Sequence, residues 1–183
     1  VSDNLTIGVA RTKGAGALPD GAPGLRQNLN GLLKLRLLRQ QEGAQPFTLT
    51  FVGVGTMSTA EKIDNPGAIR DFASFSHRFA YTGQLLIASK YSETFSLQAN
   101  AAWTHRNAVP FGDVNDIFSL GLAARLQLSK VFGLIVDYNQ PLNGERTTAN
   151  GFYPILGLGL EIDTGGHVFQ LNLTKHFLLA QLG

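Results

Sequence analysis

A strict alternation of apolar and polar residues is the feature that most constrains this chain, and it is clearest at positions 95–106. Here Phe95, Leu97 and Trp103 share one parity with two alanines, while polar residues occupy most of the intervening positions. Successive side chains of a β-strand point to opposite faces, whereas those of a helix recur about every 3.6 residues. The pattern therefore predicts a strand that has one apolar and one polar face.

The same alternation recurs along the whole chain and is more regular in its second half. Nine segments show it: 5–10, 33–38, 47–56, 79–88, 95–106, 118–128, 132–139, 156–162 and 169–174. The stretch 29–41 can alternatively form an amphipathic helix, because leucine and arginine favour helices. No linker or change of composition divides the chain, so we expect a single all-β domain over residues 1–183.

Composition excludes several classes of protein. Charged residues make up only 15% of the 183 residues, against about 25% in soluble domains. The absence of cysteine excludes disulfide scaffolds, thiol catalysis and cysteine-based metal sites. The net charge is only +2 and no basic cluster is visible, so we expect no nucleic-acid partner. No apolar run approaches the roughly 20 residues of a membrane-spanning helix, which leaves soluble β-folds and membrane β-barrels.

The connections between the predicted strands alternate in length. Short ones lie near 42–46, 92–94, 129–130 and 163–166, and long ones near 13–28, 58–76, 107–116 and 140–150. Antiparallel outer-membrane barrels have tight turns at the periplasmic end and longer loops at the other. The alternation of lengths therefore favours an antiparallel, up-and-down transmembrane β-barrel.

Three features indicate that the apolar face contacts lipid. The alternating segments reach the length that a tilted strand needs to cross the hydrocarbon layer, and the polar face is mostly small and uncharged. Aromatic residues lie at both ends of the apolar stripes, as in the two belts of membrane barrels. These predicted belts comprise Tyr91, Phe95 and Phe132 beside the short turns, and Trp103, Phe118 and Tyr138 beside the long loops. The alternative is a soluble or secreted β-barrel that binds a small apolar ligand.

Strand counting indicates a longer barrel than this sequence contains. Single-chain bacterial barrels have an even number of strands, whereas the alternation yields nine and the tail 175–183 shows no further full strand. We therefore expect a barrel of about 9–12 strands that is incomplete in this sequence and lacks at least one closing strand.

The polar face carries a small set of charges that are predicted to line the interior of the barrel. They are Lys34, Arg36, Lys90, Arg106, Arg125, Asp137 and Glu161. Five basic against two acidic groups would make a pore mildly anion-favouring. Alternatively, these groups pair across the interior and plug it, as side chains do in small barrels.

No pattern of catalytic or metal-ligating residues stands out. The four histidines, at 77, 105, 167 and 176, lie near predicted strand ends and have no metal-binding spacing. Thr104, His105 and Arg106 come nearest to a catalytic arrangement, but no serine motif accompanies them. The glycine clusters lack the lysine and hydroxyl residue of a phosphate loop. We therefore expect no enzyme, no cofactor, no catalytic residue and no metal site.

The hairpin block from 79 to 174 carries a family resemblance, in the elements HRFAYTGQ, FSLQANAAWTHRN, FSLGLAARLQLSKVFGLIVDYNQPLN and FYPILGLGLEIDTGGHVFQLNLT. They resemble an uncharacterised family of outer-membrane β-barrels typical of Bacteroidota, known as a membrane-bound β-barrel domain of unknown function. The resemblance implies a location in the outer membrane of a Gram-negative bacterium, in contact with the lipid bilayer and lipopolysaccharide. It brings no catalytic motif.

Besides the soluble or secreted, ligand-binding β-barrel, two kinds of function fit these expectations. The first is a narrow channel or a structural component that docks other outer-membrane or periplasmic proteins. A weaker hypothesis is a sheath around a redox or lipid-handling partner.

Overall fold

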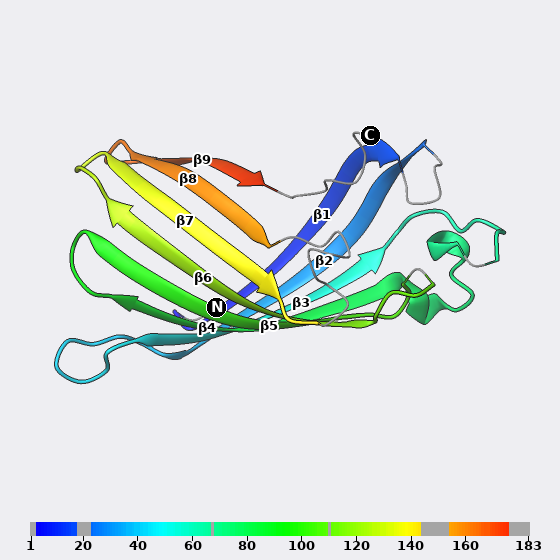
Figure 1. The fold of residues 1–183 in the computed structure, drawn as a ribbon, viewed down its shortest axis with the longest axis horizontal. Helices are drawn as coiled ribbons and strands as arrows, with labels where there is room; N and C mark the ends of the chain where they lie inside the picture. Colours follow the sequence, from blue (N-terminus) through cyan, green and yellow to red (C-terminus); the bar gives the residue numbers. More distant parts are fainter. Residues whose placement is uncertain (1–2, 18–22, 67, 110, 144–153, 176–183) are drawn as a thin grey trace. The chain divides into compact units, whose positions relative to one another are not determined.

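The computed structural model describes residues 3–17, 23–66, 68–109, 111–143 and 154–175. This part of the chain folds into nine β-strands and two short 3-10 helices, without an α-helix (Figure 1). The strands are β1 (Leu5–Ala17), β2 (Pro23–Leu38), β3 (Thr48–Ser58), β4 (Phe79–Lys90), β5 (Phe95–Arg106), β6 (Asp116–Gln127), β7 (Phe132–Pro141), β8 (Ile155–Asp163) and β9 (Val168–Lys175). The helices are η1 (Ile69–Asp71) and η2 (Phe75–Arg78).

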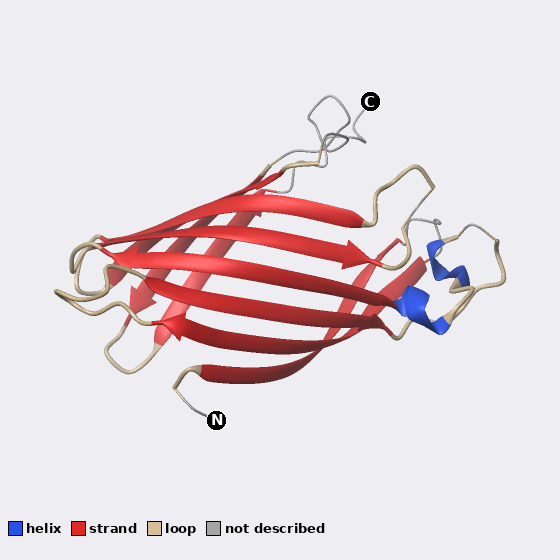
Figure 2. Ribbon diagram, turned by 90° about the horizontal axis from the view of Figure 1, so that it is seen from below, coloured by secondary structure: helices blue, strands red, loops and turns tan. Residues whose placement is uncertain are grey.

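The strands form one antiparallel up-and-down sheet, which confirms the predicted fold class. Each strand is hydrogen-bonded to the strand next to it in sequence, and β1 and β9 are the end strands of this order. Figure 2 shows the strands in red and the two short helices in blue. In the described part of the chain, neither helix is long and apolar enough to cross a membrane.

The chain divides into two compact units. Unit 1 comprises residues 1–36, 51–84 and 103–117, and unit 2 comprises residues 37–50, 85–102 and 118–183. Unit 1 therefore contains the β3–β4 and β5–β6 connections, whereas unit 2 contains β7, β8, β9 and the four connections that the sequence predicts to be short.

The first two strands are longer than the sequence predicts. The β1–β2 ladder runs from the pair Leu5 and Leu35 to the pair Ala17 and Pro23, so most of the expected long connection 13–28 is strand. The apolar stripe is interrupted here by glycine, alanine and asparagine, which weakens the alternation while leaving the backbone ladder intact. The stretch 29–41 belongs mainly to β2 and is not helical. The rest of this connection, 18–22, and the tail from 176 lie outside the described residues.

Two of the short turns share one hydrogen-bonding scheme. After β4, the hydroxyl of Ser92 accepts bonds from the N–H groups of Thr94 and Phe95, at 3.2 and 3.1 Å. After β6, the hydroxyl of Ser129 accepts bonds from Val131 and Phe132 in the same way, at 3.2 and 3.0 Å. Serine hydroxyls stabilise tight turns by this local bonding, which explains why both hairpins close in four residues.

The β3–β4 connection is held by Arg78, whose guanidinium donates to the carbonyls of Ser58 and Ala60 at 3.2 and 2.7 Å. The same guanidinium lies 4.1 Å from the ring centroid of Phe72. Phe72 has a left-handed backbone, with φ of 41°, and is the one buried large apolar side chain of the described residues. This long connection is therefore a folded loop with its own small apolar centre.

Burial along the strands is the reverse of that in a soluble sheet. In β5 the exposed positions are 95, 97, 99, 101 and 103, which are all apolar, whereas the polar residues between them are partly buried. In β6 and β8, Leu122 and Leu158 are 55% and 48% exposed. We call the face that carries these side chains the apolar face, and the opposite face the polar face. A sheet that exposes its leucines suits a hydrocarbon solvent and not water.

Candidate functional site: the polar face

The register of unit 2 places glycines and polar residues opposite each other on the polar face. Gly121 pairs with Asn139, Gly133 with Glu161, Gly157 with Asp137, and Gly159 with Asn172. These four pairs include every glycine on the polar face of β6–β9. Side chains directly opposite each other in an antiparallel pair are close neighbours, so each glycine leaves room beside a polar side chain.

The polar side chains occupy that room. A Cβ atom built on Gly157 would lie 2.7 Å from Cγ of Asp137, and one built on Gly159 would lie 2.6 Å from Oδ1 of Asn172. A Cβ on Gly121 would lie 2.9 Å from both Cγ of Asn100 and Nδ2 of Asn139. Real Cβ atoms essentially never approach other heavy atoms so closely, so the polar side chains cover the glycines.

Burial agrees with this geometry. The four glycines are the buried residues of β6–β9 in the part of the chain that the structure describes. Side chains that cover glycine backbone lean along the sheet instead of standing upright from it. The polar face of unit 2 is therefore a low-relief surface with hydrogen-bonding groups.

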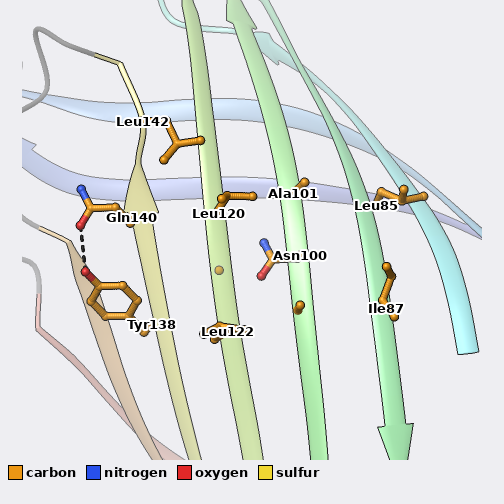
Figure 3. A pocket seen from close by; sticks show the side chains of 11 residues that line it. Leu85, Ile87, Asn100, Ala101, Leu120, Leu122, Tyr138, Gln140 and Leu142 are labelled. Carbon is orange, nitrogen blue, oxygen red and sulfur yellow. Dashed lines mark hydrogen bonds between the residues drawn. The ribbon is translucent and has the colours of Figure 1, made fainter. Parts of the chain in front are cut away.

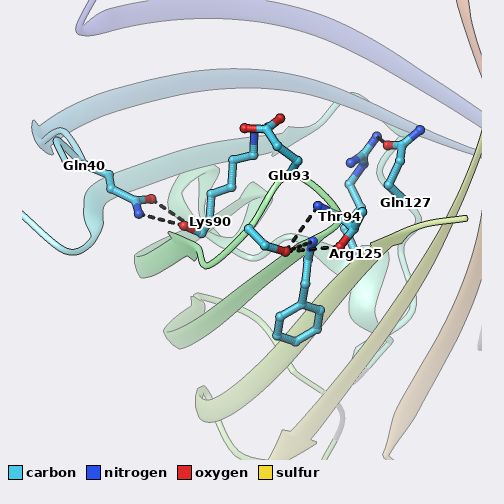
Figure 4. Close-up of polar contacts among 8 residues, drawn as sticks. Gln40, Lys90, Glu93, Thr94, Arg125 and Gln127 are labelled. Atoms are coloured by element: carbon cyan, nitrogen blue, oxygen red, sulfur yellow. Dashed lines mark hydrogen bonds and ion pairs between the residues drawn. The ribbon is translucent and has the colours of Figure 1, made fainter. Parts of the chain in front are cut away.

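An ion pair spans three strands at this face. The guanidinium of Arg125 on β6 contacts Oε1 of Glu161 on β8 through Nε, at 3.1 Å, and through Nη2. Nη2 also contacts Gln127 on the same strand (Figure 4). β7 lies between these two strands, and Gly133 sits on it opposite Glu161. Because Gly133 has no side chain, Arg125 can reach over β7 to the carboxylate.

Replacing Gly133 with valine should therefore weaken this ion pair. The first carbon of a side chain would already lie 3.4 Å from Oε1 of Glu161 and 3.6 Å from Nη2 of Arg125, which leaves no room for two more carbons. We expect a loss of about 1 kcal/mol in unfolding free energy, because Arg125 is partly exposed. Urea titration of the reconstituted protein measures this loss.

The Arg125→Gln background is the control for this prediction. If Gly133→Val acts through the ion pair, its cost should be smaller once Arg125 is gone, since coupled residues give non-additive effects. An equal cost in both backgrounds would show that the valine acts by another route.

Other predicted charges have local partners. Nζ of Lys90 lies 3.0 Å from Oε2 of Glu93 in the β4–β5 turn, and Nη2 of Arg106 lies 2.8 Å from Oδ2 of Asp113 in the β5–β6 loop. Gln40 bonds both main-chain groups of Lys90, at 2.8 and 2.9 Å (Figure 4). The ion pairs thus form within one connection or between nearby strands.

The sequence predicts five basic and two acidic residues at the interior of the barrel, but Glu93 and Asp113, which lie in connections, also contact this set. Three of the five predicted cations, Lys90, Arg106 and Arg125, have a carboxylate partner. Lys34 and Arg36 lie on β2, and among the described residues no acidic oxygen is within 4.0 Å of either side chain. The surplus of basic groups that would favour anions is therefore smaller than the sequence count indicated.

The six predicted belt residues are all exposed. Tyr91 and Phe95 stack with ring centroids 6.0 Å apart beside one short turn, and Phe132 begins the strand after another. Trp103, Phe118 and Tyr138 lie two or three residues from the long-connection ends of their strands. Nε1 of Trp103 donates to Oδ1 of Asp116 at 2.8 Å, and Nδ1 of His105 lies 2.9 Å from the same oxygen. At the long-connection ends, the indole of Trp103 and the hydroxyl of Tyr138, which donates to Gln140, thus each have a polar partner.

A groove of about 480 Å³ runs along the apolar face of unit 2. Ala99 and Ala101 on β5 form its low floor between larger side chains, and Figure 3 shows Leu85, Leu120 and Leu122 around it. The groove opens on the apolar face, so it is a shallow surface groove between exposed apolar side chains. It does not supply the enclosed cavity that the soluble, ligand-binding alternative requires.

Among the described residues, no group of three or more histidine, cysteine, aspartate or glutamate residues is placed to hold a metal ion. The nearest candidate for catalytic chemistry does not assemble as the sequence indicated. His105 contacts Asp116, whereas Thr104 bonds Thr82 at 3.0 Å and Arg106 bonds Asp113. His176 lies outside the described residues.

Sequence reasoning missed the covering of glycines by polar side chains. The alternation placed both kinds of residue on the polar face, but only the strand register shows which ones are opposite each other. The glycines inside β8 relieve crowding in the wall, and the side chains for which they leave room are those of Asp137 and Asn172.

A nine-stranded antiparallel sheet with exposed leucines and a polar opposite face defines the wall of a membrane β-barrel. The chain belongs to the family described as membrane bound beta barrel domain (DUF5777), whose model matches residues 1–181. No curated protein and no solved structure matches the chain. The protein is therefore a membrane-bound β-barrel domain, which decides against the soluble alternative.

Proposed function

We propose that this protein is a non-enzymatic β-barrel of the outer membrane of a Gram-negative bacterium and forms a narrow channel. Its apolar face contacts the lipid bilayer and lipopolysaccharide, and its polar face lines a water-filled passage. Bacterial barrels with short turns at one end and long loops at the other reside in that membrane. This chain has the same asymmetry from β3 to β9, whereas its β1–β2 connection, 18–22, is shorter than its β2–β3 connection, 39–47.

The low relief of the polar face carries the channel proposal. Side chains that stand upright from the wall fill the interior of small barrels. Here Asp137, Asn139 and Asn172 lean over glycines, and Arg125 lies along the wall toward Glu161. This arrangement keeps polar groups at the wall and leaves the centre of the passage to water.

Reconstitution into planar bilayers tests the proposal. We expect stepwise single-channel currents in KCl, and liposomes that contain the protein should swell in an isotonic solution of a small permeant solute. Protein that is folded, resistant to heat in detergent and inserted, yet gives neither current nor swelling, would contradict a channel.

Docking of other proteins is the second candidate, and exposed aromatic side chains on the long connections favour it. Phe111, in the β5–β6 loop, is fully exposed, and Phe75 in η2 is 68% exposed. The two connections are joined by a 2.7 Å bond from Nδ2 of Asn107 to the carbonyl of Ser76. Exposed aromatics of this kind frequently anchor protein interfaces.

A photo-reactive phenylalanine analogue in place of Phe111 tests docking in intact cells. We expect a crosslinked product of one defined mass, and none from the same analogue in place of Phe118, which lies on the apolar face. Identical products from both positions, or none from either, would contradict docking through this loop.

A further inference from the structure

We infer that the solute that passes this channel is small, neutral and rich in hydroxyl groups, such as a sugar or polyol. This inference rests on the proposed channel and specifies its substrate class. It follows from the balance of charge on the polar face and from the kind of hydrogen-bonding group that the face presents.

The first argument is charge compensation. Lys90, Arg106 and Arg125 each lie within 4.0 Å of a carboxylate oxygen. On the described strands, the other charged residues at polar-face positions are Arg26, Lys34 and Arg36 against Asp137 and Asp163. Three cations against two carboxylates leave a surplus of one positive charge, so the wall has little net charge to concentrate either cations or anions.

The second argument is the chemistry of the neutral groups. The polar face of β5–β9 presents six side-chain amides, from Gln98, Asn100, Gln127, Asn139, Gln170 and Asn172. An amide offers donors and an acceptor on one small group. A hydroxyl likewise donates and accepts, so successive hydroxyls of a polyol can exchange bonds along this wall without a charged anchor.

The third argument is the shape of the wall. Glycines at 121, 157 and 159 let Asn100, Asn139, Asp137 and Asn172 lie close to the backbone, so a solute meets a continuous surface instead of a ring of projecting charges. Channels that select ions use rings of charged side chains. The described polar face of β6–β9 instead carries Arg125 paired with Glu161, Asp137 lying over Gly157, and Asp163 accepting a bond from the Gly165 N–H in the short turn.

The test compares ions with sugars in the reconstituted full chain. In a KCl gradient we expect a reversal potential near zero, with a K⁺ to Cl⁻ permeability ratio within about two-fold of unity. Liposomes should swell in isotonic arabinose and more slowly in a larger oligosaccharide. A permeability ratio above about ten for either ion, or ion currents with no swelling in arabinose, would overturn the inference and leave the channel intact. Absence of both current and swelling overturns the channel itself.

Arg125→Gln tests the role of charge compensation. Without the guanidinium, Glu161 faces the passage with no cationic partner, so we expect K⁺ permeability over Cl⁻ to rise about three-fold or more. Lys130→Gln is the matched control, because it removes the same charge from a short turn outside the strands. An unchanged ratio in folded Arg125→Gln protein, or equal shifts in both variants, would overturn the assignment of Arg125 to charge compensation in the passage.

Discussion

Leu122→Arg is expected to destabilise the inserted protein by about 2–4 kcal/mol, the cost of arginine near the bilayer midplane on the lipid face of a barrel. Leu122 lies in the middle of β6, on the apolar face, and its side chain is 55% exposed. In the bilayer that exposed surface contacts acyl chains, where a guanidinium loses its hydration. Urea titration of protein folded into lipid vesicles measures this loss of unfolding free energy. The folded fraction at each urea concentration is determined from the heat-dependent shift in gel mobility.

Ala123→Arg is the matched control. The residue is next in sequence but lies on the polar face, directly opposite Asp137, so a guanidinium there can meet a carboxylate and water. We expect the loss at this position to be below about 1 kcal/mol. If the arginine at 123 costs more than the arginine at 122, the assignment of the two faces is reversed.

Gly157→Val is expected to reduce the single-channel conductance to about half or less, because it forces a charged side chain to move into the passage. Asp137 now lies over Gly157, and a Cβ at that position would be 2.7 Å from its Cγ. The carboxylate must therefore turn away from β8, toward the water that we propose fills the interior. Planar bilayer recording of the reconstituted variant measures the effect.

Ala123→Val distinguishes this displacement from simple filling of space. It adds two carbons to the polar face on the other side of Asp137, where no glycine is covered. The conductance should fall by less than in Gly157→Val, since Asp137 keeps its position. Equal losses would mean that added volume alone narrows the passage and that the covering of glycine has no part in it.

The alternation of β5–β9 was sufficient to predict the fold because these strands have one chemically uniform face. At positions 95–103, for example, each apolar residue is followed by a polar or small one, so hydrophobic periodicity alone locates the strand. β1 and β2 were predicted too short, because Gly14, Ala15 and Gly16 carry no polarity signal. These three residues pair with 24–26 through backbone hydrogen bonds, and the polarity of side chains gives no information about such bonds.

The candidate site was predictable only in part. Polarity placed Arg125, Asp137 and Glu161 on one face, and the structure brings Arg125 and Glu161 into contact. Sequence alone could not show that Gly133 lies between them, because register depends on turn conformation, and a shift of one residue moves every side chain to the other face. Asp113 was missed for a similar reason, since its contact with Arg106 depends on the shape of a loop.

Site-directed spin labelling across β6 tests the central assignment of the faces most directly. The chain contains no cysteine, so single cysteines at positions 120–127 can each carry a nitroxide in reconstituted vesicles. We predict that collisions with lipid-soluble oxygen peak at 120, 122 and 126, and that collisions with a water-soluble nickel chelate peak at 123, 125 and 127. Low accessibility of 122 and 126 to both reagents, or nickel collisions that peak at these two positions, would contradict a lipid-facing apolar face.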